Sequence, residues 1–274
     1  MISVSTIAAC CITLFVSLFL PVLVLILFAV KHKKQGIASA WLLGAAGFFV
    51  TQILIRVPIL TALQNQSWFL SFAQSHLFAY AFTLAFTAGL FELAGRFAVA
   101  RLMHKRLTLR RSLAAGLGHG GIEAMLLIGI TYINNLAYIA MINSGSFDTV
   151  VAQTAAMGVD VSQLELIQTQ LLYASPALFL LAGFERILAM TGHVAMSMLV
   201  CYGVAHHKSG ICTLLCLGIH TLIDLTAGIS LVLPQSIAYP IIYAILIVMA
   251  VLSLLVIREL FRRWKKEVSH DSEE

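Results

Sequence analysis

The stretch TIAACCITLFVSLFLPVLVLILFAVKHKK, residues 6–34, decides the fold class of this chain. Residues 6–30 contain no charged side chain, and the basic run KHKK follows them at once. A helix rises about 1.5 Å per residue, so roughly 20 apolar residues are enough to cross the hydrocarbon core of a bilayer. The run is too long for a signal peptide and has no basic segment before it. It therefore predicts a first membrane span that the protein retains.

Similar apolar runs recur along the whole chain. Of its 274 residues, 60% are hydrophobic and 11% are charged, whereas a soluble domain has about 25% charged residues. We expect an all-α, polytopic bundle of transmembrane helices, forming a single integral-membrane domain over residues 1–274 with a basic and then acidic tail at 258–274. The seven expected spans cover residues 6–30, 37–62, 71–100, 113–142, 177–205, 211–232 and 237–258.

The basic residues predict the orientation of these spans. Lys and Arg cluster after the first, third, fifth and seventh spans, whereas the connections 63–70, 143–166 and 233–236 contain none. The positive-inside rule then places the amino terminus outside and the carboxyl terminus in the cytoplasm. The sequence pI near 9.0 follows from these loops, so it does not indicate a nucleic-acid partner. The partner expected for basic residues at a membrane edge is anionic membrane lipid.

The longest polar connection, residues 143–166, is predicted to be an external loop. Residues 163–176, QLELIQTQLLYASP, are predicted to form a helical lead-in to the fifth span, with a turn or kink at Pro176.

Apart from the ends of the expected spans, ten charged or histidine residues lie inside them, where each costs on the order of 3 kcal/mol or more at mid-span and so needs a partner or a task. Six of them, from four spans, fall about 10 to 21 Å from the cytoplasmic ends when depth is counted by helical rise. These six are Glu92, His119, Glu123, His193, His220 and Asp224. The other acid and two of the arginines lie nearer the external face by the same count, where we expect a supporting ion-pair cluster of Arg56, Glu185 and Arg186.

The spacing of the deeper group predicts its geometry. His119 and Glu123, within GLGHGGIEA at 116–124, are four residues apart and share a helix face, as do His220 with Asp224 and Glu92 with Arg96. The glycines beside His119 allow neighbouring helices to approach closely. We expect the set to line one polar cavity.

Three histidines with carboxylates form a zinc-type ligand set. Zinc lowers the pKa of a coordinated water, and a nearby glutamate then takes its proton, so this combination suits hydrolysis. Arg96 would keep the carboxylate of Glu92 ionised or hold a peptide carbonyl. A proton relay uses the same residue types, so the residues alone leave that alternative open.

With GLGHGGIEA, FELAGR, ERILAMTGHVAMS and HTLID in place, the chain resembles the YhfC family of intramembrane metalloproteases over nearly its whole length. That family is grouped with the CAAX-processing and bacteriocin-processing membrane proteases and with PrsW. The wider pattern has a Glu-Glu-x-x-Arg motif, a later histidine and a His-x-x-x-Asn/Asp motif. This chain has Leu93 in place of the second acid and Ala189 in place of an expected phenylalanine, which weakens the case for catalysis.

The resemblance implies roles for the deeper residues. Glu92 would activate water, His193 and His220 would hold the metal or polarise the scissile carbonyl, and His119 with Glu123 would complete the metal site or the base. The expected site thus has Glu92, Glu123 and Arg96 as catalytic groups, His119, His193 and His220 as metal ligands, and Asp224, Glu185 and Arg186 in support. The implied cofactor is a divalent metal, Zn²⁺, and the implied location is a bacterial plasma membrane.

The predicted function is that of a metal-dependent endopeptidase that cleaves a membrane-associated protein or peptide. Two alternatives remain open at this point. One is a non-catalytic membrane scaffold of the same superfamily, in which the polar cluster binds partner helices. The other is a proton- or ion-coupled transporter, although such proteins usually have broken helices and two related halves.

Overall fold

The computed structural model describes the backbone of residues 1–270 and the side chains of residues 1–264. The acidic end of the predicted tail, residues 271–274, lies outside the described residues, as do the side chains of Lys265 and Lys266. Within the described part, all regular secondary structure is helical. This confirms the all-α prediction.

Among the described residues, seven helices are long and apolar enough to cross a membrane, as predicted, and the chain is a multi-pass integral membrane protein. The orientation of its termini stays a prediction. The candidate spans are Val4–Lys31, Ile37–Gln64, Leu77–Leu102, Leu109–Ser144, Pro176–Ala205, Ser209–Val232 and Gln235–Trp264. The third begins six residues later than expected, because His76 leaves helical geometry and separates it from a short preceding helix.

Three of the spans contain a π-helical segment, which widens the helix locally and is frequent at functional sites. Their helical segments are α1 (Val4–Leu14), η1 (Phe15–Phe19) and α2 (Leu20–Lys31); α3 (Ile37–Phe48), η2 (Phe49–Arg56) and α4 (Val57–Gln64); and α7 (Leu109–Glu123), η4 (Ala124–Gly129) and α8 (Ile130–Ser144).

The third and fifth spans are continuous α-helices, α6 (Leu77–Leu102) and α11 (Pro176–Ala205). Pro176 opens α11, as the lead-in prediction required, and α10 (Ser162–Tyr173) is that lead-in. The predicted loop 143–166 differs from expectation, because α9 (Phe147–Ala156) occupies much of it. The remaining elements are α5 (Ser67–Ser75), η3 (His104–Arg106), α12 (Ser209–Leu225), η5 (Thr226–Gly228), α13 (Ile229–Val232) and α14 (Gln235–His270).

Two compact units divide the chain. The first comprises Met1–Leu23 and Ala124–Ile187, and the second comprises Val24–Glu123 and the chain from Leu188 onward. The first unit packs α1 against α8 around a small apolar core that includes Cys10, Tyr132, Ile139, Leu171 and Phe179. Whether one integral-membrane domain contains both units stays a prediction.

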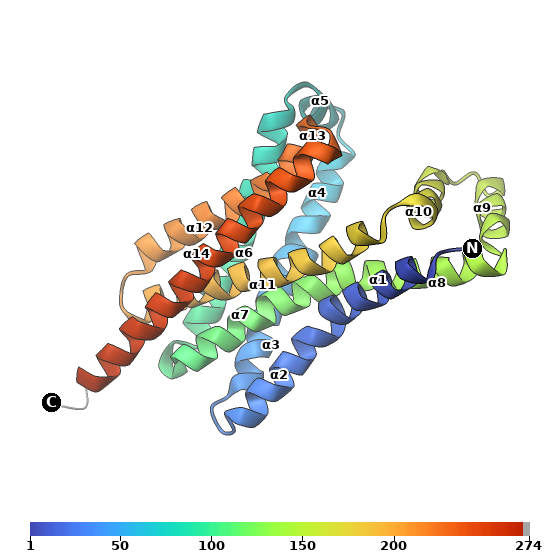
Figure 1. Ribbon diagram of the computed structural model, residues 1–274. Helices are drawn as coiled ribbons and strands as arrows, with labels where there is room; N and C mark the ends of the chain where they lie inside the picture. The colour runs from blue at the N-terminus through green and yellow to red at the C-terminus, as the bar shows by residue number, and fades with distance from the viewer. Residues whose placement is uncertain (271–274) are drawn as a thin grey trace. The chain divides into compact units, whose positions relative to one another are not determined.

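In the second unit, α3 and α7 lie side by side and run in the same direction (Figure 1). Small residues allow this contact, since a Cβ on Gly44 would stand 1.9 Å from the carbonyl oxygen of Ala115, and one on Gly118 would stand 1.9 Å from that of Trp41. Such close approach of backbones is the usual way in which membrane helices associate without a hydrophobic driving force.

Further glycines join the neighbouring helices of the second unit. Gly95 lets α6 contact α3, Gly89 lets α6 contact α12, and Gly116 and Gly120 let α7 contact α11. A Cβ at Gly120 would stand 2.9 Å from the Cβ of His193, so this glycine brings α7 against the ring of that histidine. The glycines of the GLGHGGIEA motif therefore position α7 against the site.

Candidate metal centre

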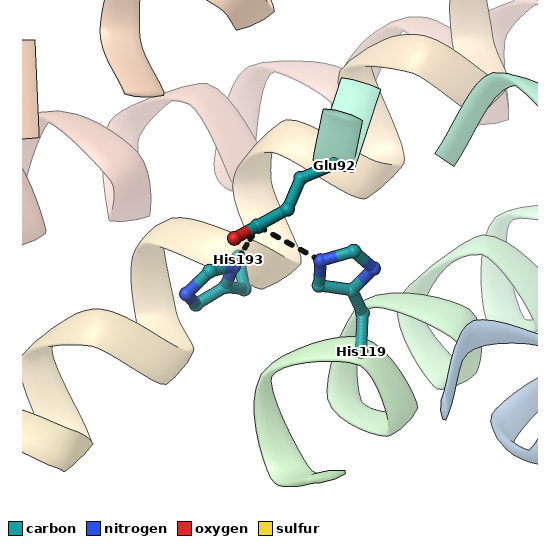
Figure 2. Close-up of side chains that lie close together, drawn as sticks. All are labelled: Glu92, His119 and His193. Carbon is teal, nitrogen blue, oxygen red and sulfur yellow. Dashed lines mark hydrogen bonds and ion pairs between the residues drawn. The ribbon is translucent and has the colours of Figure 1, made fainter. Parts of the chain in front are cut away.

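The carboxylate of Glu92 is the centre of the polar cluster, and α6 presents it to three neighbouring helices of the second unit. Its Oε2 atom lies 3.0 Å from Nε2 of His119 on α7 and 3.6 Å from Nδ1 of His193 on α11 (Figure 2). The Nδ1 atom of His220 on α12 is also 3.6 Å away. Three imidazole nitrogens from three helices thus converge on one carboxylate oxygen.

Protein atoms cover this cluster almost completely. The exposed fraction is 4% for Glu92, 1% for His119, 6% for His193 and 2% for His220. The ring of His119 stacks on that of His193 with centroids 5.4 Å apart, and the ring of Phe48 packs nearly perpendicular to that of His119 with centroids 5.3 Å apart. Because these groups have little access to solvent, their charges and hydrogen bonds must be satisfied within the protein.

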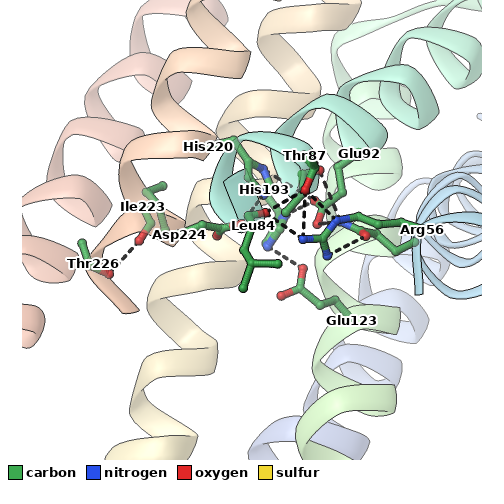
Figure 3. Close-up of polar contacts among 12 residues, drawn as sticks. Arg56, Leu84, Thr87, Glu92, Glu123, His193, His220, Ile223, Asp224 and Thr226 are labelled. Atoms are coloured by element: carbon green, nitrogen blue, oxygen red, sulfur yellow. Dashed lines mark hydrogen bonds and ion pairs between the residues drawn. The ribbon is translucent and has the colours of Figure 1, made fainter. Parts of the chain in front are cut away.

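A carboxylate contacts the outer nitrogen of two of the histidines (Figure 3). Nε2 of His193 lies 2.7 Å from Oε2 of Glu123, and Nε2 of His220 lies 3.1 Å from Oδ2 of Asp224. A carboxylate accepts hydrogen bonds, so Nε2 of His220 carries the proton and its Nδ1 turns a lone pair toward Glu92. Metal-binding histidines commonly have this arrangement, with a carboxylate on the far nitrogen.

Arg96 also contacts the inward-facing atoms. Its Nη2 donates to Oε2 of Glu92 at 2.9 Å and to Nδ1 of His193 at 2.6 Å, and its Nη1 lies 3.5 Å from Nδ1 of His220. A guanidinium has only donors, which is consistent with lone pairs on both Nδ1 atoms. Arg96 therefore engages the same lone pairs that a metal ion would need.

Sequence reasoning missed Gln52, which is buried in η2. Its Nε2 donates to Oε1 of Glu92 at 2.7 Å and to the carbonyl of Ala88 at 3.3 Å. A glutamine carries no charge, so it does not stand out among the ionisable residues of the spans. The available signal was a lone amide in the otherwise apolar run FFVTQIL, residues 48–54.

Arg56 lies one turn beyond Gln52 and extends the same network. Its Nη1 donates to Oε1 of Gln52 at 3.4 Å, and its Nη2 donates to the carbonyl of Leu84 at 2.7 Å (Figure 3). This differs from the predicted grouping of Arg56 with Glu185 and Arg186. Those two residues form an ion pair with each other in the first unit.

The residues at the centre fit a divalent cation. Oxygen or nitrogen atoms of Glu92, His119 and His193 all lie within 4.8 Å of one another, so one ion could bind all three. Zinc–ligand bonds of about 2.0–2.1 Å in tetrahedral geometry place ligand atoms about 3.3 Å apart, close to the spacing around Oε2 of Glu92. This group shares His119 and His193 with the predicted ligand set and adds Glu92. Nδ1 of His220 lies 3.6 Å from Oε2 of Glu92, and its role as a ligand stays a prediction.

A small cavity adjoins the cluster and has a volume of about 10 Å³, close to the least that one water molecule needs. Arg96, His119 and Ser197 contribute to its wall, and the buried Oγ of Ser197 has no hydrogen-bond partner among the described residues. An unpaired buried hydroxyl is costly, so a water at this position would satisfy it.

The comparisons with known proteins agree with the motifs. The sequence profile of the family described as YhfC intramembrane metalloprotease matches residues 16–258, which include every residue of the cluster. The "Uncharacterized membrane protein YhfC" of Bacillus subtilis (strain 168) is 32% identical over 195 residues, covering 70% of this chain and 73% of that protein. No solved structure matches the chain.

Proposed function

Because the chain belongs to the YhfC intramembrane metalloprotease family, we propose that it is a membrane-embedded, metal-dependent endopeptidase that cleaves a membrane-associated peptide or protein at the Glu92 cluster. One observation carries the proposal: three imidazole nitrogens converge on a single buried carboxylate oxygen, and carboxylates contact the outer nitrogens of two of these rings. All of these groups lie within candidate spans, so a substrate would reach them from within the membrane.

Glu92, His119 and His193 would hold the metal, a two-histidine and one-glutamate set of the kind that catalytic zinc sites use. A bound divalent cation would supply Lewis-acid polarisation of the scissile carbonyl and would activate water. Zinc is the metal we propose, because imidazole and carboxylate ligands suit it. Glu123 contacts the outer nitrogen of His193 and would orient its ring, so it acts as a positioning residue.

His220 is then the proposed general base. Its Nδ1 lone pair faces Glu92, and Asp224 accepts a hydrogen bond from its Nε2, which would stabilise the ring when it takes the proton of the attacking water. Arg96, whose guanidinium lies between these groups, would stabilise negative charge on the carbonyl oxygen. This assignment exchanges the roles that the family resemblance gives to Glu92 and His220.

The metal content of the detergent-purified protein tests the proposal. We expect near one zinc per chain in the wild type, loss of the metal in His119→Ala and His193→Ala, and retention in His220→Ala. Glu165→Gln on α10, where the side chain is exposed, is the matched control. No zinc in the wild type after reconstitution would exclude the mechanism. Metal lost in His220→Ala but kept in Glu92→Gln would restore the roles implied by the resemblance.

Proteolysis itself is tested in membranes from cells that express the wild type or His220→Ala. Cleaved membrane proteins are identified by their new amino termini, and those that need both the metal and His220 are the expected substrates. Glu165→Gln should give the wild-type pattern. Identical patterns for the wild type and His220→Ala would contradict the assignment of the base.

One observation favours the non-catalytic scaffold as a second candidate. The guanidinium of Arg96 already supplies a positive charge beside Oε2 of Glu92, so this carboxylate has a cationic partner without a metal. A wild-type protein that stays folded and excludes zinc would support this role.

A further inference from the structure

A second polar region of the second unit lies where α3 and α7 begin, apart from the Glu92 cluster. An open cavity of about 980 Å³ is found there. Residues of the segments that lead into the two helices form most of its wall, and Trp264 closes part of it. The residues that line this cavity include Lys34, Gly36, Arg106, Thr108, Arg110 and Arg111.

Four of these residues carry positive charge, and no Asp or Glu among the described residues lines the cavity. None of the four forms a salt bridge within the described part of the chain; Arg110 donates from Nη1 to the neutral Oε1 of Gln35 at 3.0 Å. The positive field also reaches His32 beside the cavity, since partial desolvation and the charges of Arg110 and Lys31 lower the pKa of this imidazole. The cavity therefore holds an excess of positive charge that the protein does not neutralise.

The two helices add to that charge. Because α3 (12 residues) and α7 (15 residues) run in the same direction, both amino termini face this region. Backbone N–H groups and the positive end of the helix dipole make such termini favourable places for an anion. Two helix amino termini together with four cationic side chains should attract an anion more strongly than either feature alone.

Gly36 and Arg111 shape the wall of the cavity. Gly36 has a φ of +67°, and a Cβ on it would stand 2.0 Å from Nη1 of Arg111, so the guanidinium packs directly on the glycine backbone. The Nε of Arg111 is buried without a hydrogen-bond partner among the described residues. Arginine is suited to bind phosphate oxygens through several donors at once.

We propose that this cavity binds a phosphate-bearing anion, either the headgroup of an anionic phospholipid or a soluble phosphate ester. Lys34, Arg106 and Arg110 would supply charge at its rim, and Arg111 with the start of α7 would contact the phosphate oxygens. The site is separate from the metal centre, since Arg111 and His119 are about 12 Å apart along α7 by helical rise. It would bind its ligand whether or not the proposed protease activity exists.

Binding to the delipidated full-length protein tests the proposal, with dihexanoyl-phosphatidylglycerol, dihexanoyl-phosphatidylcholine, glycerol 1-phosphate and inorganic phosphate as probes. Isothermal titration should show saturable binding of phosphatidylglycerol and none, or about tenfold weaker binding, of phosphatidylcholine. If the two probes without acyl chains bind as tightly as phosphatidylglycerol, the ligand is a soluble phosphate ester. If they bind far more weakly, it is a phospholipid.

The variants separate a built site from general attraction to a basic surface. Arg106→Gln/Arg110→Gln removes two exposed cavity charges and should raise the dissociation constant about tenfold. Arg101→Gln/Lys105→Gln removes two exposed charges, at the end of α6 and in the connection after it, that lie outside the cavity wall, and should change the dissociation constant less than about twofold. Equal effects of the two pairs, or no saturable binding of any anionic probe, would overturn the proposal. Thermal melting of each variant checks that it is folded.

Discussion

The Glu92 cluster and the cavity at the start of α3 and α7 differ in whether their charged groups have partners of opposite charge. In the cluster, Glu92 has Arg96 at 2.9 Å and His119 at 3.0 Å, and the outer nitrogens of two histidines contact carboxylates of their own. In the cavity, four cations face an opening without an acid among the described residues. A charge inside a span needs a partner close by, because the hydrocarbon core does not solvate it. A charge at the membrane edge can stay unpaired until a ligand arrives.

The largest effect expected from this comparison is on stability at the cluster. Glu92→Gln leaves the guanidinium of Arg96, which is 3% exposed, without its carboxylate. Breaking one partner of a buried pair costs about 3–5 kcal/mol, so unfolding of the metal-free protein in detergent should become easier by that amount. Glu92→Gln/Arg96→Gln should recover part of the loss, because the unpaired charge is gone. A loss below about 1 kcal/mol in the single variant would show that the cluster tolerates an unbalanced charge.

The comparison also shows which features a sequence can predict. The spans are readable because each is a long apolar run, and the pairs His119–Glu123, His220–Asp224 and Glu92–Arg96 follow from the helical repeat of about 3.6 residues. In the structure the second and third pairs are in direct contact, and Glu123 contacts His193. The helix repeat fixes which residues share a face but not which neighbouring helix that face meets.

The predicted grouping of Arg56 and the omission of Gln52 have the same cause, since a sequence does not show which neighbouring helix each face meets. The position of Arg56 along its span predicts its depth but not the direction of its side chain. In the structure that side chain donates hydrogen bonds to Gln52, Thr87 and Leu84. Gln52 was overlooked because a neutral amide does not stand out among ionisable residues. The basic cavity could not be predicted, because it depends on two helices far apart in sequence starting side by side.

Metal affinity provides the next test. Nη2 of Arg96 engages Oε2 of Glu92 and Nδ1 of His193, which are atoms that the metal would bind. Arg96→Gln removes a competing cation, so its zinc dissociation constant should fall about 10- to 100-fold, while proteolysis should decrease because the charge that faces the carbonyl oxygen is lost. Competition with a fluorescent chelator measures the zinc affinity. Arg56→Gln is the control, because it removes a nearby arginine and keeps the contact between Glu92 and Arg96. Weaker zinc binding in Arg96→Gln would mean that the guanidinium orients the ligands.

Variants of Glu123 and Asp224, whose carboxylates contact the outer nitrogens of His193 and His220, distinguish a histidine that binds the metal from one that acts as the base. Glu123 contacts His193, a proposed metal ligand, so Glu123→Gln should weaken zinc binding about 10- to 100-fold. Asp224 contacts His220, the proposed base, so Asp224→Asn should leave zinc affinity nearly unchanged and should lower the rate of cleavage. For each variant, chelator competition measures the zinc affinity, and cleavage of an identified substrate by the same preparation measures the rate. Equal losses of affinity in the two variants would place His220 among the metal ligands.

The smallest effect is expected at the basic cavity. Arg110→Gln in lipid-free detergent should change the free energy of unfolding by less than about 0.5 kcal/mol, because among the described side chains the exposed guanidinium has the neutral Gln35 as its only partner. The sign should be stabilising at low salt, since one of four mutually repelling charges is removed, and added salt should erase the difference by screening that repulsion. Melting curves of the wild type and Arg110→Gln at low and high ionic strength measure both. If Arg110→Gln is destabilised by more than about 1 kcal/mol, the cation has a structural partner, and the contrast between balanced and unpaired charge fails.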